Sequence, residues 1–238
     1  MPRIVTLVPA AGIGTRFGAS TPKQYSPLLD RPMLYHAIRV LAEHAAIEQV
    51  VVVLAPDDTH WDTHDWRAFA PKLLPLFCGG ETRAESVANA LTHLATEFKP
   101  NDWLLVHDAA RPCLRAQLID RLIENLREDE VGGLLAVPMT DTMKRADGWQ
   151  RVESTEPRER LWRAQTPQMF RYGILQRALA AAPAGVPTDE SWAVEKLGLH
   201  PRLVHGDVTN FKVTFPEDIA VAELLLRAIQ VDAHRSGV

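Results

Sequence analysis

The sequence predicts an α/β fold of three layers, in which a Rossmann-like, mostly parallel sheet lies between two layers of helices. The first observation behind this prediction is that short apolar runs alternate with segments of helical period along most of the 238 residues. The second is that several runs are apolar throughout and rich in β-branched residues, as strands covered on both faces are. We therefore expect one domain over residues 1–238, with a subregion at about 139–168 that departs from this order.

In the first half of the chain, strands are predicted at RIVTLV, QVVVVLA, LLPLFC and DWLLVHD. The segment PMLYHAIRVLAEHAA places Leu34, Ile38 and Leu41 on one face of a helix. A further helix begins after Thr82, and Glu85 three residues later completes a capping-box pattern. These elements give the β–α order that a parallel sheet requires.

In the second half, a helix at AQLIDRLIENLRE and a strand at GGLLAVPM continue the order, and a polar segment then breaks it. The alternating stretches TMKRA and WQRVES flank a turn-like ADG, which predicts a β-hairpin arm extending from the main body. Because a lone two-stranded ribbon is marginal in water, we expect the arm to pack on a second copy of the chain, as a homodimer.

The last third of the chain returns to regular elements. We expect a helix near 171–182, a short helix after Thr188 and a strand at PRLVHG. A final helix is predicted to begin with a capping box formed by Thr214 and Glu217.

Composition and charge exclude several classes of protein. The apolar fraction of 46% and the charged fraction of 24% are those of an ordinary soluble globular protein. The net charge of -4 and the lack of a long basic run argue against a nucleic-acid surface, and no apolar stretch is long enough to span a membrane. Cys78 and Cys113 are isolated, so we expect reduced thiols in a cytoplasmic protein.

A glycine-rich loop follows the first strand, and the stretch from Val8 to Tyr25 has the sequence VPAAGIGTRFGASTPKQY. It is a poor dinucleotide fingerprint, because Gly18 comes one position late and a proline-containing segment follows where a helix is needed. It is not a P-loop, since the sequence has no G-x-x-x-x-G-K-[ST] string. Another kind of triphosphate loop fits, because glycines turn backbone N–H groups toward phosphate while Arg16 and Lys23 add positive charge. A tight surface loop is the structural alternative.

Several motifs together resemble those of a known family. The glycine-rich loop with PKQY is followed, in order, by GGETRAESV, VHDAARP, PMTDTMKR, LWRAQTPQMF, TDESWAVE and NFKVTFPEDIAVAE. In sequence and order these resemble the sugar-phosphate nucleotidyltransferases, and most closely the 2-C-methyl-D-erythritol 4-phosphate cytidylyltransferases. The resemblance covers essentially the whole chain and implies a nucleotidyltransferase fold that dimerises through its β-arm.

The resemblance implies transfer of a cytidylyl group from CTP to 2-C-methyl-D-erythritol 4-phosphate, with Mg²⁺ as cofactor, in isoprenoid-precursor synthesis. Such a step needs in-line positioning and charge neutralisation rather than covalent chemistry from the protein. The nearest alternative is a cytidylyltransferase for another polyol phosphate, such as ribitol 5-phosphate. A nucleotide-binding regulatory module and a dehydrogenase are alternatives from other classes.

The resemblance assigns the chemistry to three cations and one carboxylate. Arg16, Lys23 and Lys212 are expected to be catalytic, since fixed cations stabilise charge on the α-phosphate and on departing pyrophosphate. Asp108 ends a predicted strand, where ligands bind in open α/β sheets, and is expected to hold Mg²⁺. Lys212 lies in the predicted strand NFKVT, whose alternation turns it away from its apolar neighbours. The structural alternatives are a solvated turn lysine at position 23 and a turn cap at position 108.

The resemblance also assigns residues to the two substrates. Nucleotide contacts are expected from Ala10, Ala11, Gly12, Gly14, Gly80, Glu81, Arg83, Ser86 and Ala109. Acceptor contacts are expected from Arg111, Thr188 and Lys212, and from the arm residues Thr142 and Arg158, which reach the site of the partner subunit. From the residues alone, exposed helix surface is the favoured interpretation of Arg83 and Ser86. Likewise, Arg111 fits an ion pair with the preceding aspartate, and Thr188 fits a helix N-cap.

Two histidine patterns have simpler interpretations than a metal or catalytic site. His60 and His64 lie four residues apart among aspartates, a spacing that could bind zinc on a helix. No remote ligand set accompanies them, so a polar helix face is expected. His107 precedes Asp108, and strand alternation sends it to the other face, which predicts a core or supporting position.

Overall fold

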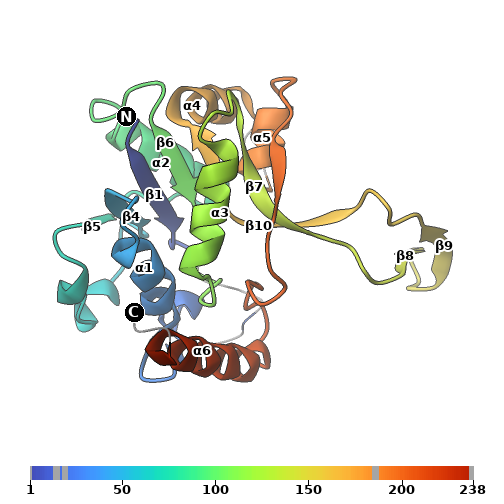
Figure 1. Cartoon of the computed structure of the whole chain (residues 1–238), viewed down its shortest axis with the longest axis horizontal. Coiled ribbons are helices and arrows are strands. Elements are labelled where there is room, and N and C mark those ends of the chain that lie inside the picture. The colour runs from blue at the N-terminus through green and yellow to red at the C-terminus, as the bar shows by residue number, and fades with distance from the viewer. Residues whose placement is uncertain (1, 13–16, 18–20, 184–187, 236–238) are drawn as a thin grey trace.

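The computed structural model describes residues 2–12, 17, 21–183 and 188–235, and Figure 1 shows their arrangement. Its main sheet has seven strands in the order β11–β7–β10–β6–β1–β4–β5. In that order, the strands are β11 (Arg202–His205), β7 (Gly132–Pro138), β10 (Trp162–Arg171), β6 (Trp103–Val106), β1 (Ile4–Pro9), β4 (Gln49–Val53) and β5 (Leu73–Leu76). Within this sheet β10 runs antiparallel to both of its neighbours, and the other pairs are parallel. The mostly parallel sheet is therefore confirmed.

Helices cover both faces of the sheet, which confirms the three layers. One face packs against α1 (Met33–Glu43) and α3 (Ala116–Leu126), and the other against α2 (Arg83–His93), α4 (Tyr172–Ala181) and α5 (Glu190–Glu195). Strand alternation divides the residues between these two cores, because Val5 and Leu7 of β1 face α2 and α4 while Val8 faces α1. The predicted apolar face of α1, from Leu34 to Leu41, is buried in the first core.

A third, smaller core lies beside the sheet. The hairpin of β2 (Pro27–Leu28) and β3 (Arg31–Pro32) packs with α6 (Asp218–Arg235), and Leu28, Met33 and Leu226 are buried between them. Short 3₁₀ turns lie at Lys23–Tyr25, Trp61–Thr63 and Arg67–Phe69. In the described part of the chain, no helix is both long and apolar enough to cross a membrane.

The two predicted capping boxes have different outcomes. The Thr82 side chain accepts from the Glu85 N–H at 3.1 Å, and the Glu85 carboxylate accepts from the Thr82 N–H at 3.1 Å, which confirms the first. The second is wrong, because the carboxylate that accepts from the Thr214 N–H, at 2.7 Å, belongs to Asp218 and not to Glu217. α6 accordingly begins at Asp218, later than the predicted cap implies.

The predicted hairpin arm consists of β8 (Met143–Ala146) paired with β9 (Val152–Glu156), and it projects from the body of the molecule in Figure 1. The arm is shorter than predicted, because residues 162–168 belong to β10 in the main sheet. Along β10 the register with β7 shifts, so that three residues between Ala164 and Gln168 face one residue between Leu134 and Ala136. We call residues 165–167 the β10 bulge.

His36 ties α1 to the β2–β3 hairpin inside the protein. Its Nε2 lies 2.8 Å from Leu28 O, a group that can only accept, so Nε2 carries a proton. The buried Nδ1 atom has no hydrogen-bond partner among the described residues. Burial lowers the pKa of His36, because a second proton would place an unpartnered charge in the core.

This burial predicts a pH dependence of stability. The unfolded chain binds a proton at His36 below about pH 6.5, whereas the folded chain does so only at lower pH. The free energy of unfolding should therefore fall as the pH drops below that value, by at most about 1.4 kcal/mol per pH unit from this one group. Urea denaturation of the wild-type chain and of His36→Gln measures the difference, and the variant should lack this part of the slope.

The control for this experiment is His93→Gln, at an exposed position of α2, which should retain the wild-type slope. Identical slopes in the wild-type chain and in His36→Gln would contradict the prediction.

Candidate active site

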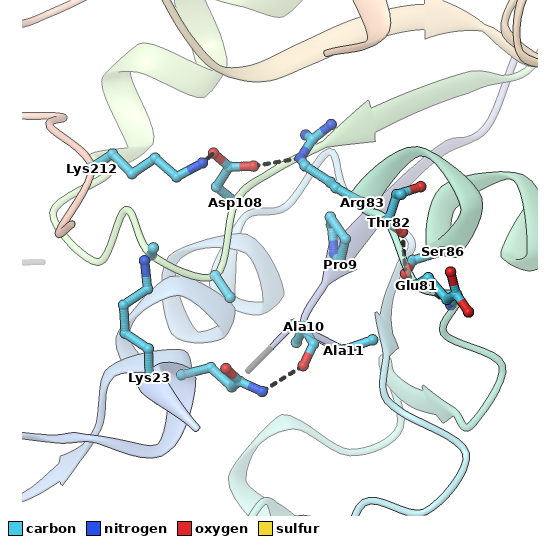
Figure 2. Close-up of a pocket in the computed structure, with 15 residues that line it drawn as sticks. Pro9, Ala10, Ala11, Lys23, Glu81, Thr82, Arg83, Ser86, Asp108 and Lys212 are labelled. Carbon is cyan, nitrogen blue, oxygen red and sulfur yellow. Dashed lines mark hydrogen bonds and ion pairs between the residues drawn. The ribbon is translucent and has the colours of Figure 1, made fainter. Parts of the chain in front are cut away.

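A cleft of about 180 Å³ opens at the carboxyl ends of β1 and β6, where open α/β sheets bind ligands (Figure 2). It brings together eleven of the predicted site residues, namely Ala10, Ala11, Gly12, Lys23, Gly80, Glu81, Arg83, Ser86, Asp108, Ala109 and Lys212. Pro9, Gln24, Thr82 and Ala110, which were not predicted as site residues, also line it. Gly14 and Arg16 lie outside the residues that the structure describes.

The loop at Gly79 and Gly80 forms one wall of the cleft through a close backbone approach. A Cβ atom added at Gly79 would overlap the side chain of Ala11, so glycine allows this loop to lie against the end of β1. The Gly80 N–H donates to Ser86 Oγ at 3.1 Å, and the Ser86 hydroxyl donates to Thr82 O at 2.9 Å. Ser86 is therefore a buried part of the wall rather than exposed helix surface.

Lys23 enters the cleft from a 3₁₀ turn, and the PKQY motif ties this turn to two other walls. Lys23 Nζ donates to Val213 O at 2.9 Å, which joins the turn to the segment that carries Lys212. The next residue, Gln24, is buried, and its Nε2 donates to Ala10 O at 2.6 Å. The motif thus places a cation and also holds the backbone at the start of the glycine-rich loop.

Asp108 is surrounded by cations from three different elements. Its Oδ1 accepts from Arg83 Nε at 2.8 Å, and its Oδ2 accepts from Lys212 Nζ at 2.8 Å, as Figure 2 shows. Arg111 Nε lies 3.8 Å from Oδ2. Burial alone would raise the pKa of Asp108, but these three cations outweigh it and hold the pKa well below its usual range. The carboxylate therefore keeps its charge throughout the neutral pH range.

Arg111, which was predicted to face the acceptor phosphate, has a largely buried guanidinium in the structure. It donates to Asn210 O at 2.7 Å and to Ala164 O at 3.3 Å. The ion pair with Asp108 that was its structural alternative is present at 3.8 Å. In this arrangement Arg111 joins β10 to the segment before Lys212.

Lys212 lies in a segment without regular secondary structure, residues 211–214, and the strand predicted at NFKVT is absent there. Two contacts fasten the preceding residues to the β10 bulge. Asn210 Nδ2 donates to Thr166 O at 2.8 Å, and Gln165 Nε2 donates to Asp207 O at 2.7 Å. The side chain of Lys212 is 39% exposed while the following residue is fully buried, so the predicted alternation holds without the strand.

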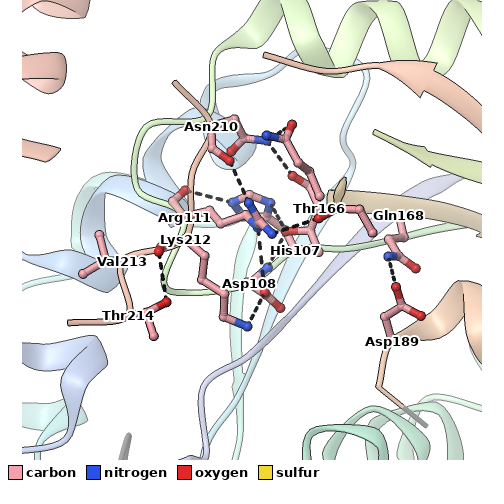
Figure 3. Close-up of polar contacts among 12 residues, drawn as sticks. His107, Asp108, Arg111, Thr166, Gln168, Asp189, Asn210, Lys212, Val213 and Thr214 are labelled. Carbon is pink, nitrogen blue, oxygen red and sulfur yellow. Dashed lines mark hydrogen bonds and ion pairs between the residues drawn. The ribbon is translucent and has the colours of Figure 1, made fainter. Parts of the chain in front are cut away.

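His107 is fully buried, as predicted, and joins β6 to the β10 bulge. Its Nε2 lies 3.2 Å from Arg111 O, which can only accept, so this nitrogen carries the proton of the neutral ring. Its Nδ1 then accepts from the Thr166 hydroxyl at 3.1 Å, and Thr166 Oγ1 accepts from the Asp108 N–H at 3.0 Å (Figure 3). Burial lowers the pKa of His107 to about 4, so its ring is neutral at neutral pH. Each group in this chain of hydrogen bonds therefore keeps its role as donor or acceptor.

Besides Arg111, which does not line the cleft itself, three more predicted acceptor residues lie outside it. Thr142 and Arg158 are exposed at the base of the arm, where Arg158 donates to Thr140 O. Thr188 is exposed before α5, and the N-cap of that helix is Asp189, whose carboxylate accepts from the Trp192 N–H at 2.9 Å. The N-cap interpretation of Thr188 is therefore wrong, and its role as an acceptor contact stays a prediction.

His60 and His64 pack on an aromatic ring instead of lying on a polar helix face. Their rings lie 5.2 and 5.5 Å from the ring of Tyr25, whose hydroxyl donates to Asp58 Oδ2 at 2.9 Å. Among the residues the structure describes, no three histidine, cysteine or acidic side chains are grouped as a metal site would need. The two histidines therefore pack against Tyr25, the residue that follows Gln24.

Glu190 is a cleft-supporting residue that the sequence analysis missed. Its carboxylate accepts from both terminal nitrogens of Arg83, at 2.5 and 2.9 Å, and its side chain is 1% exposed. It lies in the TDESWAVE motif, where a charged residue at the start of a short helix was not assigned a role. The available signal was that Glu190 lies between Asp189 and Ser191 in one of the motifs that carry the family resemblance.

Known proteins resemble the chain over nearly its whole length. A model of the family described as 2-C-methyl-D-erythritol 4-phosphate cytidylyltransferase matches residues 4–228. A protein of that name from Azoarcus sp. (strain BH72) is 56% identical over 237 residues, which is 100% of this chain and 97% of the relative. One from Nitrosomonas eutropha is 57% identical over 229 residues, which is 95% of this chain and 98% of the relative.

Solved structures agree with the sequence comparison. A crystal structure of 4-diphosphocytidyl-2C-methyl-D-erythritol synthase superposes with a TM-score of 0.84 at 40% identity, covering 95% of this chain and 99% of that one. The cytidylyltransferase from Thermus thermophilus gives a TM-score of 0.75 at 28% identity, covering 93% and 98%. The family match, the relatives and the fold all agree, and this chain belongs to the 2-C-methyl-D-erythritol 4-phosphate cytidylyltransferase family.

Proposed function

We propose that this chain transfers the cytidylyl group of CTP to 2-C-methyl-D-erythritol 4-phosphate, a step in the synthesis of isoprenoid precursors. The products are 4-CDP-2-C-methyl-D-erythritol and pyrophosphate. Family membership supports this reaction, and one observation of the structure carries it. The cleft holds Lys23, Lys212 and Arg83 at the carboxyl edge of the sheet, with the last two bound to Asp108, an arrangement suited to a triphosphate beside a second phosphate.

The proposed chemistry is one substitution at phosphorus. An oxygen of the acceptor phosphate forms a bond to the α-phosphorus of CTP, and the bond from that phosphorus to the bridging oxygen of the β-phosphate breaks. Negative charge then grows on pyrophosphate, which Lys23 and Arg16 are proposed to stabilise. Lys212 is half-exposed and bound to Asp108 by one contact, so it can exchange that contact for an acceptor phosphate oxygen.

We assign the cytidine to the wall built from small residues and backbone groups. Its residues are Ala10, Ala11, Gly12, Gly80, Glu81, Ser86 and Ala109, with Gly14 added on the resemblance of its motif. Such a wall favours a pyrimidine over a purine by size and by backbone hydrogen bonds. Arg83 also lines the cleft and is proposed as a further nucleotide contact, while its guanidinium donates to Asp108 and Glu190.

Asp108 is the residue proposed to hold Mg²⁺. Protein sites for Mg²⁺ commonly supply one or two carboxylates and leave the other positions to substrate phosphates and water. Asp108 lies at the carboxyl edge of the sheet, in a cleft that Glu81 also lines, and it would accept a metal that arrives with the triphosphate once Lys212 left one of its oxygens for the acceptor. When bound, the metal would draw charge from the phosphate oxygens.

The acceptor site is proposed to be completed by a second copy of the chain. Thr142 and Arg158 do not line the cleft of their own chain, and the arm that carries them projects from the body (Figure 1). A homodimer would cover this marginal ribbon and bring both residues to the partner's acceptor site, beside Arg111, Thr188 and Lys212.

A cytoplasmic location is also proposed. Both cysteines, Cys78 and Cys113, are free thiols, as is usual for proteins of a reducing compartment.

The purified chain with CTP and Mg²⁺ should release pyrophosphate with 2-C-methyl-D-erythritol 4-phosphate and not with ribitol 5-phosphate. The acceptor contacts differ for the two substrates, whereas the nucleotide contacts are shared. A chelator should abolish release, and added Mg²⁺ should restore it. Release with ribitol 5-phosphate alone would overturn the acceptor assignment, and release with neither acceptor, despite confirmed CTP binding, would overturn the reaction.

Lys212→Met should lower kcat/KM by about 10²–10³, because it removes a fixed cation while keeping a side chain of similar length. Pyrophosphate release measures the loss, and thermal unfolding checks that the variant is folded. Lys72→Met is the matched control, since Lys72 Nζ donates to His44 O away from the cleft. A Lys212→Met enzyme with wild-type turnover would remove this lysine from the chemistry.

Mixing Arg158→Ala with Lys212→Met should restore activity if each site draws on two chains. After subunit exchange, one of the two sites in each mixed dimer contains neither substitution, so roughly a quarter of the wild-type rate is expected. Differently tagged chains show how much mixed dimer has formed. Failure to recover activity in proven mixed dimers would argue against shared sites.

A further inference from the structure

Glu190 is a buried carboxylate with no place in the reaction described above. It is the first residue of α5, and its side chain is 1% exposed. Its two oxygens accept from the two terminal nitrogens of Arg83, at 2.5 and 2.9 Å, which is the paired geometry of a bidentate guanidinium–carboxylate contact. Such a buried pair adds little net stability, because desolvation offsets most of the attraction. What the pair determines is where the arginine lies.

Arg83 in turn determines the surroundings of Asp108. While Glu190 holds both terminal nitrogens, Arg83 Nε donates to Asp108 Oδ1 at 2.8 Å. The other oxygen of Asp108 accepts from Lys212 at 2.8 Å. The carboxylate at the cleft is therefore held between a cation that is itself fixed and a half-exposed lysine that can move.

α5 presents Glu190 from a rigid position. The residues on both sides of it are bound to β10, because Gln168 Nε2 donates to Asp189 Oδ2 at 3.0 Å and the Ser191 N–H donates to Gln168 Oε1 at 2.8 Å. Asp189 also caps the helix through the Trp192 N–H at 2.9 Å. A side chain so fixed at its base can set the orientation of the group it binds.

We propose that Glu190 is a positioning residue of the transfer reaction, and that it acts by fixing Arg83 and thereby the Asp108 carboxylate. The inference rests on the proposed function for the reaction it serves. Without the Glu190 charge, the terminal nitrogens of Arg83 are released to bind Asp108 or the phosphates of CTP. The charges of the cluster also change, since three cations (Arg83, Arg111 and Lys212) then face one carboxylate instead of two.

The kinetic effect of replacing Glu190 distinguishes a positioning role from a loss of stability. In Glu190→Gln, kcat should fall on the order of 10–100-fold, because the carboxylate and the lysine beside it lose their fixed geometry. The KM for CTP should fall, because the cleft gains one unit of positive charge toward a polyanion. A residue that only stabilises the fold would lower the amount of active enzyme and the melting temperature without improving CTP binding.

The decisive experiment combines Glu190→Gln with Arg83→Lys in a double-mutant cycle. If Glu190 acts through Arg83, the loss of kcat caused by Glu190→Gln should largely disappear in the Arg83→Lys background. Glu195→Gln, on the exposed side of the same helix, is the matched control and should keep the wild-type kcat. Wild-type kcat in Glu190→Gln, or an equal loss in both backgrounds, would overturn the proposal.

Two further measurements keep the outcome decisive. Calorimetric titration with CTP needs no acceptor, so it tests the proposal even if the wild-type chain is inactive with 2-C-methyl-D-erythritol 4-phosphate. Glu190→Gln should bind CTP more tightly than the wild-type chain, and weaker binding by a folded variant would count against the proposal. If Glu190→Gln does not fold, Glu190→Asp keeps the charge but shortens its reach. A full kcat in that variant would overturn the positioning role.

Discussion

The β10 bulge is the constraint on which the geometry of the cleft depends. In a regular ladder the backbone groups of a central strand bond to its neighbours, but the register shift frees the Thr166 carbonyl to accept from Asn210. The Thr166 hydroxyl, from the same residue, accepts from the backbone of Asp108. Gln168, directly after the bulge, fastens the start of α5. The β10 bulge and the residue after it thus hold three segments that are far apart in the sequence: the end of β6, the segment before Lys212 and the start of α5.

These attachments serve a cluster of charges that is balanced before any ligand arrives. Asp108 keeps its negative charge because the cations around it outweigh the effect of burial. The cations differ in freedom, because Arg83 is held by a second carboxylate and Arg111 by backbone carbonyls, whereas Lys212 is half-exposed. Preorganised groups of this kind reduce the reorganisation needed when phosphate charge develops. The neutral ring of His107 supports the cluster without adding charge to it.

The sequence predicted the elements whose signal is local. Apolar periodicity located the helices and the parallel strands, and the motifs located most cleft residues. It failed where partners are distant in the chain. The antiparallel direction of β10 depends on its pairing with β6 and β7. The start of α6 depends on whether Glu217 or Asp218 accepts the hydrogen bond from the Thr214 N–H. Glu190 was missed for the same reason, since its partner Arg83 lies more than a hundred residues earlier.

β10 also joins two parts of the molecule that would otherwise be separate. Its first residues extend the ladder toward the arm, where the Met139 N–H donates to Leu161 O at 2.9 Å, and its later residues carry the bulge and pair with β6. Ten residues of strand thus connect the projecting ribbon to the clamp around Asp108. A displacement of the ribbon by a bound partner would therefore be transmitted along this strand to the point where Asp108 and the Lys212 segment are attached. Binding at the ribbon and adjustment of the cleft would then be mechanically coupled.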